Sequence, residues 1–184
     1  LNHFKQQMES VGLKHVQLFE GRVVLDEYGA VNGHAGCTAS HRALLEMQIA
    51  NGWPRMFVFE DDAKLIYSDF SERWDRFAAE LPSDWDMIYL GGTLLGSQRR
   101  LSDNVLSADR INCTQSYGIT LPAATTFAPL AKTYAPIDMV YGDIPAHNHR
   151  FIINPRLVGQ KEFKSDTDGT LNIERMKEFI DPQK

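Results

Sequence analysis

Cysteine and long apolar runs are both scarce in this chain of 184 residues. It has two cysteines, and no stretch approaches the roughly 18 consecutive apolar residues that a membrane span requires. The first ten residues also lack the apolar run of a signal peptide. Cys37 and Cys113 are too far apart for the closely spaced pairs of a zinc site or a disulfide framework. We therefore expect a soluble, cytoplasmic protein with two buried thiols, in contact with a membrane only peripherally, at its inner face.

Clustered positive charge is also missing. The chain carries 19 Lys and Arg against 24 Asp and Glu, a net charge of −5. Binding to a nucleic-acid backbone draws its affinity from clustered Lys and Arg, so a nucleic-acid partner is not expected.

The length sets the domain organisation. A chain of 184 residues with 43% hydrophobic content can bury one substantial core and is too short for two. We expect a single domain over residues 1–184.

Apolar runs and amphipathic segments alternate along the chain. Met56 to Phe59 is a continuous apolar run, typical of a strand buried on both faces, while Phe70, Trp74 and Phe77 share one face of a helix over residues 70–81. Further helices are predicted over 1–11, 38–51, 122–132 and 172–180, and further strands over 15–19, 86–90, 111–121 and 151–153. Residues 20–36 and 97–104 are predicted as loops. This alternation favours an α/β fold with a mostly parallel sheet flanked by helices, in which the strand over 56–59 lies centrally.

Three carboxylates, Glu60-Asp61-Asp62, come directly after the apolar run. Ligands of open α/β sheets bind beyond the carboxyl ends of the strands, and adjacent carboxylates repel one another unless a cation compensates. Hard ions such as Mn²⁺ and Mg²⁺ prefer oxygen ligands of this kind. On residue types alone, a solvated acidic turn explains the triplet equally well.

A second candidate segment is Gly36 to His41, where small residues and hydroxyls stand at the predicted start of a helix. Free N–H groups at such a start attract anions such as a diphosphate. Simple capping by Thr38 or Ser40 is the alternative. His41 taken alone is typical of a structural histidine, and His147 and His149 are assigned to a loop.

Taken together, Gly36-Cys37 with Ser40-His41, followed by Phe59-Glu60-Asp61-Asp62-Ala63, resemble glycosyltransferase family 25, which includes lipooligosaccharide and collagen galactosyltransferases. Residues 85–91, 136–138 and 154–167 look similar too, so that the resemblance spans about residues 12–168. It implies a GT-A fold, a UDP-sugar donor, a divalent metal (Mn²⁺ or Mg²⁺) and inversion at the anomeric carbon. The acceptor would be a glycan, glycolipid or glycoprotein hydroxyl, with galactose as the favoured sugar.

The resemblance also implies roles for individual residues. Asp62 would bind the metal and Asp61 would share it, while Asp138 would be the catalytic base, with Asp143 as the alternative. The residues implied in binding the nucleotide sugar are Ser40, His41, Glu60, Asp61, Gln160, Ser165 and Asp166. Gln160 and Asp166 are therefore expected close to the acidic triplet.

One departure from the family pattern leaves other functions open. Family members usually open with a strand and an arginine-containing turn, which we expect upstream of Leu1. A catalytically inactive sugar- or nucleotide-binding protein is the main alternative to a transferase. A metal-dependent phosphatase or hydrolase is disfavoured, since no nucleophile motif accompanies the triplet.

Overall fold

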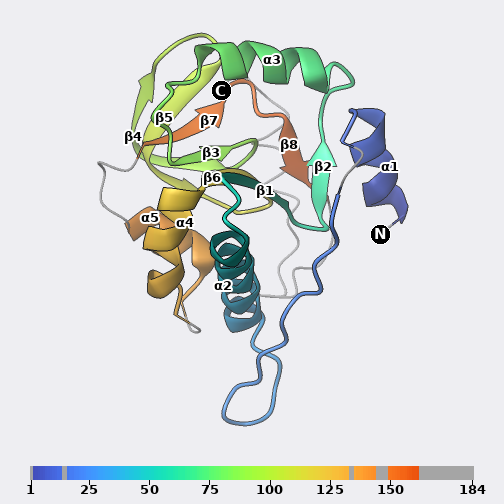
Figure 1. Cartoon of the computed structure of the whole chain (residues 1–184), viewed down its shortest axis with the longest axis vertical. Helices are drawn as coiled ribbons and strands as arrows, with labels where there is room; N and C mark the ends of the chain where they lie inside the picture. The colour runs from blue at the N-terminus through green and yellow to red at the C-terminus, as the bar shows by residue number, and fades with distance from the viewer. Residues whose placement is uncertain (1, 14–15, 133–134, 144–148, 162–184) are drawn as a thin grey trace.

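The computed structural model of the chain describes residues 2–13, 16–132, 135–143 and 149–161 (Figure 1). A six-stranded sheet in the order β1-β6-β3-β7-β5-β4 forms its centre, and a two-stranded sheet, β2-β8, lies beside it. The strands are β1 (Arg55–Phe59), β2 (Ala63–Leu65), β3 (Met87–Tyr89), β4 (Thr93–Arg100), β5 (Val105–Asn112), β6 (Ser116–Thr120), β7 (Arg150–Ile153) and β8 (Val158–Gln160). The helices are α1 (Asn2–Ser10), α2 (Gly33–Asn51), α3 (Phe70–Glu80), α4 (Leu121–Phe127), a 3-10 turn (Ala128–Leu130) and α5 (Ile137–Asp143).

The large sheet is mixed, which corrects the prediction of a mostly parallel sheet. Among the described strands of this sheet, only β3 and β7 pair in parallel, whereas β1-β6, β6-β3, β7-β5 and β5-β4 are antiparallel. The predicted strand over 111–121 is two strands, because the chain turns between them at Cys113, whose φ is +72°. The predicted loop over 97–104 belongs largely to the β4-β5 hairpin. Continuous apolar strands are therefore compatible here with neighbours of either direction.

Strand β1 lies at an edge of this sheet, so the prediction of a central position is wrong. Its residues alternate between buried and less buried, and Phe57 is 41% exposed. The ring of Phe57 contacts Trp74 of α3 edge-on, with ring centroids 5.5 Å apart. This strand is thus half-covered rather than buried on both faces.

The helices agree with the sequence where local signals are strong. Helix α3 covers the predicted segment, and α2 ends before Gly52, whose φ of +63° closes it. Helix α2 begins five residues earlier than predicted, because the Asn32 side chain accepts a hydrogen bond from the Ala35 N–H. Residues 16–19, predicted as a strand, have no regular structure. The predicted helix over 172–180 lies outside the described residues.

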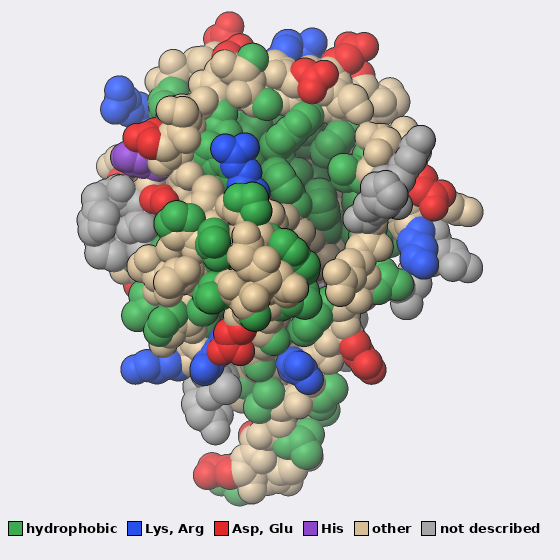
Figure 2. Space-filling view, viewed as in Figure 1, with side chains coloured by type: hydrophobic (Ala, Val, Ile, Leu, Met, Phe, Trp, Pro, Cys, Tyr) green, Lys and Arg blue, Asp and Glu red, His purple; other side chains and the backbone are tan. Residues whose placement is uncertain are grey.

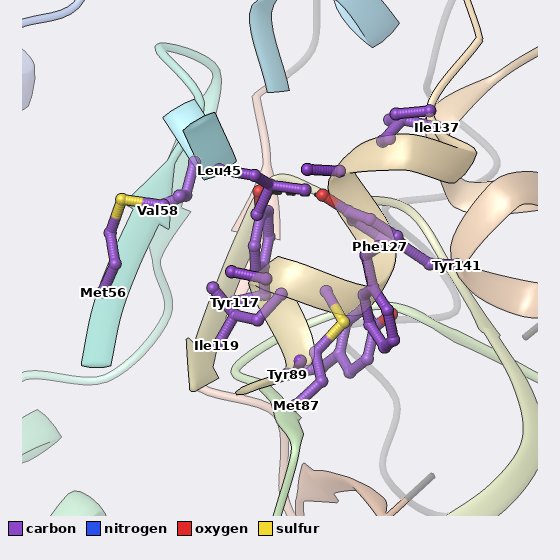
Figure 3. Packing of buried hydrophobic residues seen from close by; sticks show 14 of the residues in the cluster. Leu45, Met56, Val58, Met87, Tyr89, Tyr117, Ile119, Phe127, Ile137 and Tyr141 are labelled. Atoms are coloured by element: carbon purple, nitrogen blue, oxygen red, sulfur yellow. Dashed lines mark hydrogen bonds between the residues drawn. The ribbon is translucent and has the colours of Figure 1, made fainter. Parts of the chain in front are cut away.

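Two apolar clusters hold the layers together. The first, on the side of α2, α4 and α5, is built around Tyr117, Phe127 and Tyr141 (Figure 3). The second packs α1, α3 and the small sheet against the opposite side through residues such as Phe77 and Phe151. Burying a side chain of this size stabilises the fold by roughly 1.5–3 kcal/mol.

Over the described part of the chain, no helix is both long and apolar enough to cross a membrane.

Candidate functional site

A cleft of about 1040 Å³ opens beside the carboxyl end of β1, bordered by α2 and by the segment that precedes it. Apolar side chains such as Leu44, Met47 and Val58 cover part of its wall, and Figure 2 shows that apolar side chains gather in a hollow on one face of the molecule. Most of the residues singled out from the sequence line this cleft: Ser40, His41, Glu60, Asp61, Asp62, Asp138 and Gln160. The expectation that the acidic triplet and the segment 36–41 share one cleft is confirmed.

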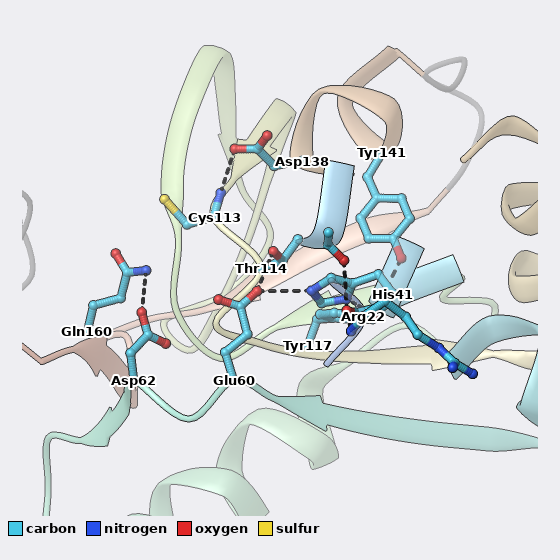
Figure 4. Close-up of polar contacts among 12 residues, drawn as sticks. Arg22, His41, Glu60, Asp62, Cys113, Thr114, Tyr117, Asp138, Tyr141 and Gln160 are labelled. Atoms are coloured by element: carbon cyan, nitrogen blue, oxygen red, sulfur yellow. Dashed lines mark hydrogen bonds and ion pairs between the residues drawn. The ribbon is translucent and has the colours of Figure 1, made fainter. Parts of the chain in front are cut away.

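Glu60 is fixed by two side chains from distant parts of the chain (Figure 4). Its Oε1 accepts hydrogen bonds from His41 Nε2 at 3.0 Å and from Thr114 Oγ1 at 2.7 Å. Burial works to raise the pKa of Glu60, but the hydrogen bond and charge interaction with His41, together with the Thr114 hydrogen bond, outweigh it and the pKa is lowered. Glu60 is therefore an oriented carboxylate that stays ionised.

Asp62 has the opposite electrostatic environment. It is 7% exposed, and burial, followed by the charges of Glu60 and Asp61, raises its pKa to about 7. Its Oδ2 accepts a hydrogen bond from Gln160 Nε2 at 3.0 Å, across 98 positions of sequence. The expected approach of Gln160 to the triplet is thus confirmed. Asp62 Oδ1 and Gln160 Oε1 are buried without a hydrogen-bond partner among the described residues.

His41 connects Glu60 to the core. Its Nδ1 lies 2.8 Å from the hydroxyl of Tyr117, which in turn lies 3.3 Å from the hydroxyl of Tyr141. Complete burial raises the pKa of both tyrosines, so both hydroxyls remain protonated and hydrogen-bonded. His41 therefore positions Glu60 from inside the core.

Gly36 to Ser40 do not form the helix start that the sequence suggested. They lie inside α2, where the Gly36 N–H already donates to the Asn32 carbonyl at 2.9 Å. The Ser40 hydroxyl donates to the Gly36 carbonyl and accepts from the Arg22 N–H, both at 2.7 Å. A Cβ on Gly36 would lie 2.7 Å from the Arg22 carbonyl oxygen. This segment therefore packs the chain at Arg22, which is part of the cleft wall, closely against α2. The N-cap of α2 is Asn32, so neither Thr38 nor Ser40 caps the helix.

The remaining acidic candidates differ in their surroundings. Asp138, on α5, lines the cleft and accepts a hydrogen bond from the Cys113 N–H at 3.3 Å. Asp61 lines the cleft as well, and its side chain is exposed. Asp143 is paired with Arg110 instead, which makes it a poor alternative base. Ser165 and Asp166 lie outside the described residues, as does His147, and the His149 ring is paired with Asp84.

Sequence reasoning missed two groups in the site. Thr114 reaches Glu60 because β6 runs antiparallel to β1 and pairs Ser116 with Phe59, and nothing in the local sequence predicts that pairing. Cys37 lies with His41 and Glu60 in one group of side chains whose sulfur, nitrogen and oxygen atoms lie within 4.8 Å of one another. Its separation of four residues from His41 is a helical signal that could have found it.

Comparison with known proteins identifies the family of this chain. Residues 29–141 match the model of glycosyltransferase family 25 (LPS biosynthesis protein). A 62-residue stretch is 39% identical to the human inactive glycosyltransferase 25 family member 3, covering 32% of this chain and 10% of that protein. The rat relative, named as probably inactive, is 37% identical over 62 residues, which are 32% of this chain and 11% of that protein. The match thus spans about a tenth of the length of these curated relatives, whereas the family match covers more than half of this sequence, and the chain belongs to glycosyltransferase family 25.

Proposed function

We propose that this chain is an inverting glycosyltransferase that moves a sugar, galactose by preference, from a UDP-sugar to a hydroxyl of a glycan, glycolipid or glycoprotein. Mn²⁺ or Mg²⁺ would bind the donor diphosphate. Membership of the family supports the reaction class. The observation that carries the proposal is the pair of buried oxygens, Asp62 Oδ1 and Gln160 Oε1, that have no partner among the described residues.

The residues present fit a hard divalent cation. Buried oxygens without a partner lose free energy unless a ligand satisfies them, and carboxylate and amide oxygens are ligands that Mg²⁺ and Mn²⁺ accept. Asp62 would hold the ion, with Asp61 sharing it and Gln160 beside it. When bound, such an ion supplies neutralisation of the charge on the departing diphosphate.

Two further carboxylates would act on the substrates. Glu60 uses Oε1 for His41 and Thr114, and Figure 4 shows its other oxygen on the side of Asp62, where it could accept from a ribose or sugar hydroxyl. Asp138, on α5, would remove the proton from the acceptor hydroxyl. The Cys113 N–H holds one oxygen of Asp138, which orients the carboxylate without neutralising it.

A protein that binds a nucleotide sugar without transferring it is the second candidate. The names of the human and rat relatives, inactive and probably inactive, favour it. The fixed Glu60 and the Asp62-Gln160 pair would serve binding equally well. Binding and turnover must therefore be measured on the same preparation.

The experiment combines UDP calorimetry with UDP release from UDP-galactose, for the wild type and for Asp62→Asn. We expect UDP to bind in Mn²⁺ and not in EDTA, and UDP release to fall at least about a hundredfold in the variant, since each 1.4 kcal/mol or so of lost stabilisation is tenfold. Asp143→Asn is the matched control, because Asp143 is paired with Arg110 and does not line the cleft. Equal UDP binding by the wild type in EDTA contradicts the metal role of Asp62. Manganese-dependent binding with no release of UDP supports the binding protein instead.

A further inference from the structure

A second group of side chains of the types that bind metals lies in the same cleft, two of them on α2 and one on the acidic turn. One sulfur, one nitrogen and one oxygen ligand, from Cys37, His41 and Glu60, all lie within 4.8 Å of one another. We propose that these three residues form a site for a thiophilic divalent cation of the zinc class, distinct from the Asp62-Gln160 position.

Helical spacing and the fold bring these ligands together. Cys37 and His41 are four residues apart in α2 and so share one face, and Glu60 reaches that face from the end of β1. Zinc sites are mostly tetrahedral, with sulfur at about 2.3 Å and nitrogen or oxygen at about 2.0–2.2 Å, so two ligand atoms of one ion lie roughly 3.3–3.8 Å apart. The three ligand atoms here lie within 4.8 Å of one another, and binding would require side-chain rotations that close the remaining gap.

The surroundings of His41 match those of a metal-bound histidine. Ligating histidines usually have the second ring nitrogen hydrogen-bonded, which fixes the ring and the tautomer. Here Nδ1 is held by the buried Tyr117 hydroxyl at 2.8 Å, and Tyr117 is in turn within reach of Tyr141. Nε2 consequently faces Glu60 Oε1 at 3.0 Å. A cation bound there would displace the proton between them, and the neutral ring would then carry its proton on Nδ1 and donate it to the Tyr117 hydroxyl oxygen.

Charge and ligand type separate this position from the one proposed for Mn²⁺ or Mg²⁺. Burial, followed by the charges of Glu60, Asp138 and Asp62, raises the pKa of the Cys37 thiol to about 12. A cation bound here would therefore have to displace the thiol proton, while the same three carboxylates attract cations to this position. Thiolate and imidazole ligands favour zinc-like ions, whereas carboxylate and amide oxygens favour Mg²⁺ and Mn²⁺. Three protein ligands beside an open cleft leave a fourth position for water or another ligand.

Cobalt substitution tests the site directly, because Co²⁺ bound to a thiolate gives a sulfur-to-cobalt charge-transfer band. The wild type should show this band at one equivalent of Co²⁺, and added Zn²⁺ should abolish it. Cys37→Ser should remove the band and weaken Zn²⁺ binding at least about a hundredfold in competition with a chelating dye, while Tyr117→Phe should weaken it about 10- to 100-fold. Cys113→Ser is the matched control, since Cys113 lines the same cleft, and it should retain the band.

Three results would overturn the proposal: no band in the wild type, an unchanged band in Cys37→Ser, or loss of the band in Cys113→Ser. Circular dichroism of each variant shows whether it is folded, and Tyr117→Phe provides a second route that leaves all three ligands in place. The Asp62→Asn variant separates this site from the transferase proposal. It should lose manganese-dependent UDP binding and keep the cobalt band.

Discussion

Replacing Asp62 with asparagine should make the metal-free protein more stable above neutral pH. The pKa of Asp62 is raised from 3.8 to about 7, first by burial and then by the charges of Glu60 and Asp61. In the unfolded chain the group returns to its ordinary value, so ionised Asp62 destabilises the fold. At 1.36 kcal/mol for each pKa unit, the penalty has a ceiling of about 4 kcal/mol.

The stability gained by Asp62→Asn should increase as the pH rises from about 4 to 7. Below about pH 4 the carboxyl is protonated in both states and the penalty vanishes, between about pH 4 and 7 it grows, and above pH 7 it is complete. The asparagine side chain would keep an oxygen for Gln160, but its amide hydrogens need partners, which costs roughly 1–3 kcal/mol. A net gain of about 1–3 kcal/mol remains above pH 7, and each kcal/mol raises Tm by about 2–4 °C for a chain of this size.

Thermal and urea unfolding in EDTA at pH 5 and pH 8 provide the measurement. Asp61→Asn is the control, because Asp61 is exposed and its replacement should change stability by no more than about 0.5 kcal/mol. The reasoning is wrong if Asp62→Asn melts at or below the wild type at pH 8. It is equally wrong if the difference between the two proteins is the same at both pH values.

Two other predictions concern packing and hydrogen bonding. Thr114→Val removes a hydrogen bond to Glu60 and should lower the free energy of unfolding by about 1.5–3 kcal/mol at pH 7, measured in urea. Because the pKa of Glu60 is lowered in the fold, this loss of stability should shrink as the pH falls below 4.5. A loss that stays constant with pH would show that the hydrogen bond does not depend on the charge of Glu60. Gly91→Ala should prevent folding, since its Cβ would collide with the Val158 carbonyl, whereas Gly159→Ala meets only a side chain at 3.7 Å and should express and melt like the wild type.

Local periodicity predicted the parts of the fold that short segments determine. The apolar face of α3 and the Gly52 stop of α2 are readable from sequence, and the structure has both. The β4-β5 hairpin was missed because most of β4 is exposed, so its residues carry no apolar alternation. Strand direction was missed for a related reason: pairing depends on distant segments, and a run such as Met87–Tyr89 is equally apolar beside a parallel or an antiparallel neighbour.

In the candidate site too, residues with a local sequence signal were predictable, and residues brought in by distant pairing were not. The acidic triplet was found from its place after an apolar strand, but the Gln160 contact was expected only from resemblance to the family. The role of Ser40 was misjudged because the Asn32 cap moves the helix start outward, placing the hydroxyl within the helix. Thr114 had no local signal, since only the antiparallel pairing of β6 with β1 brings it to Glu60.

The small β2-β8 sheet joins the segments that carry Asp62 and Gln160. Three residue pairs hold it together, and one of them, Ala63 with Gln160, adjoins Asp62 directly. Local opening of such a short pair of strands costs less free energy than unfolding the whole protein. A ligand that needs both Asp62 and Gln160 binds only those protein molecules in which this sheet is closed. Its apparent affinity is therefore reduced in proportion to the fraction of molecules with a closed sheet. Amide hydrogen exchange at Lys161, whose N–H donates to the Asp62 carbonyl, would report that opening and should slow when such a ligand binds.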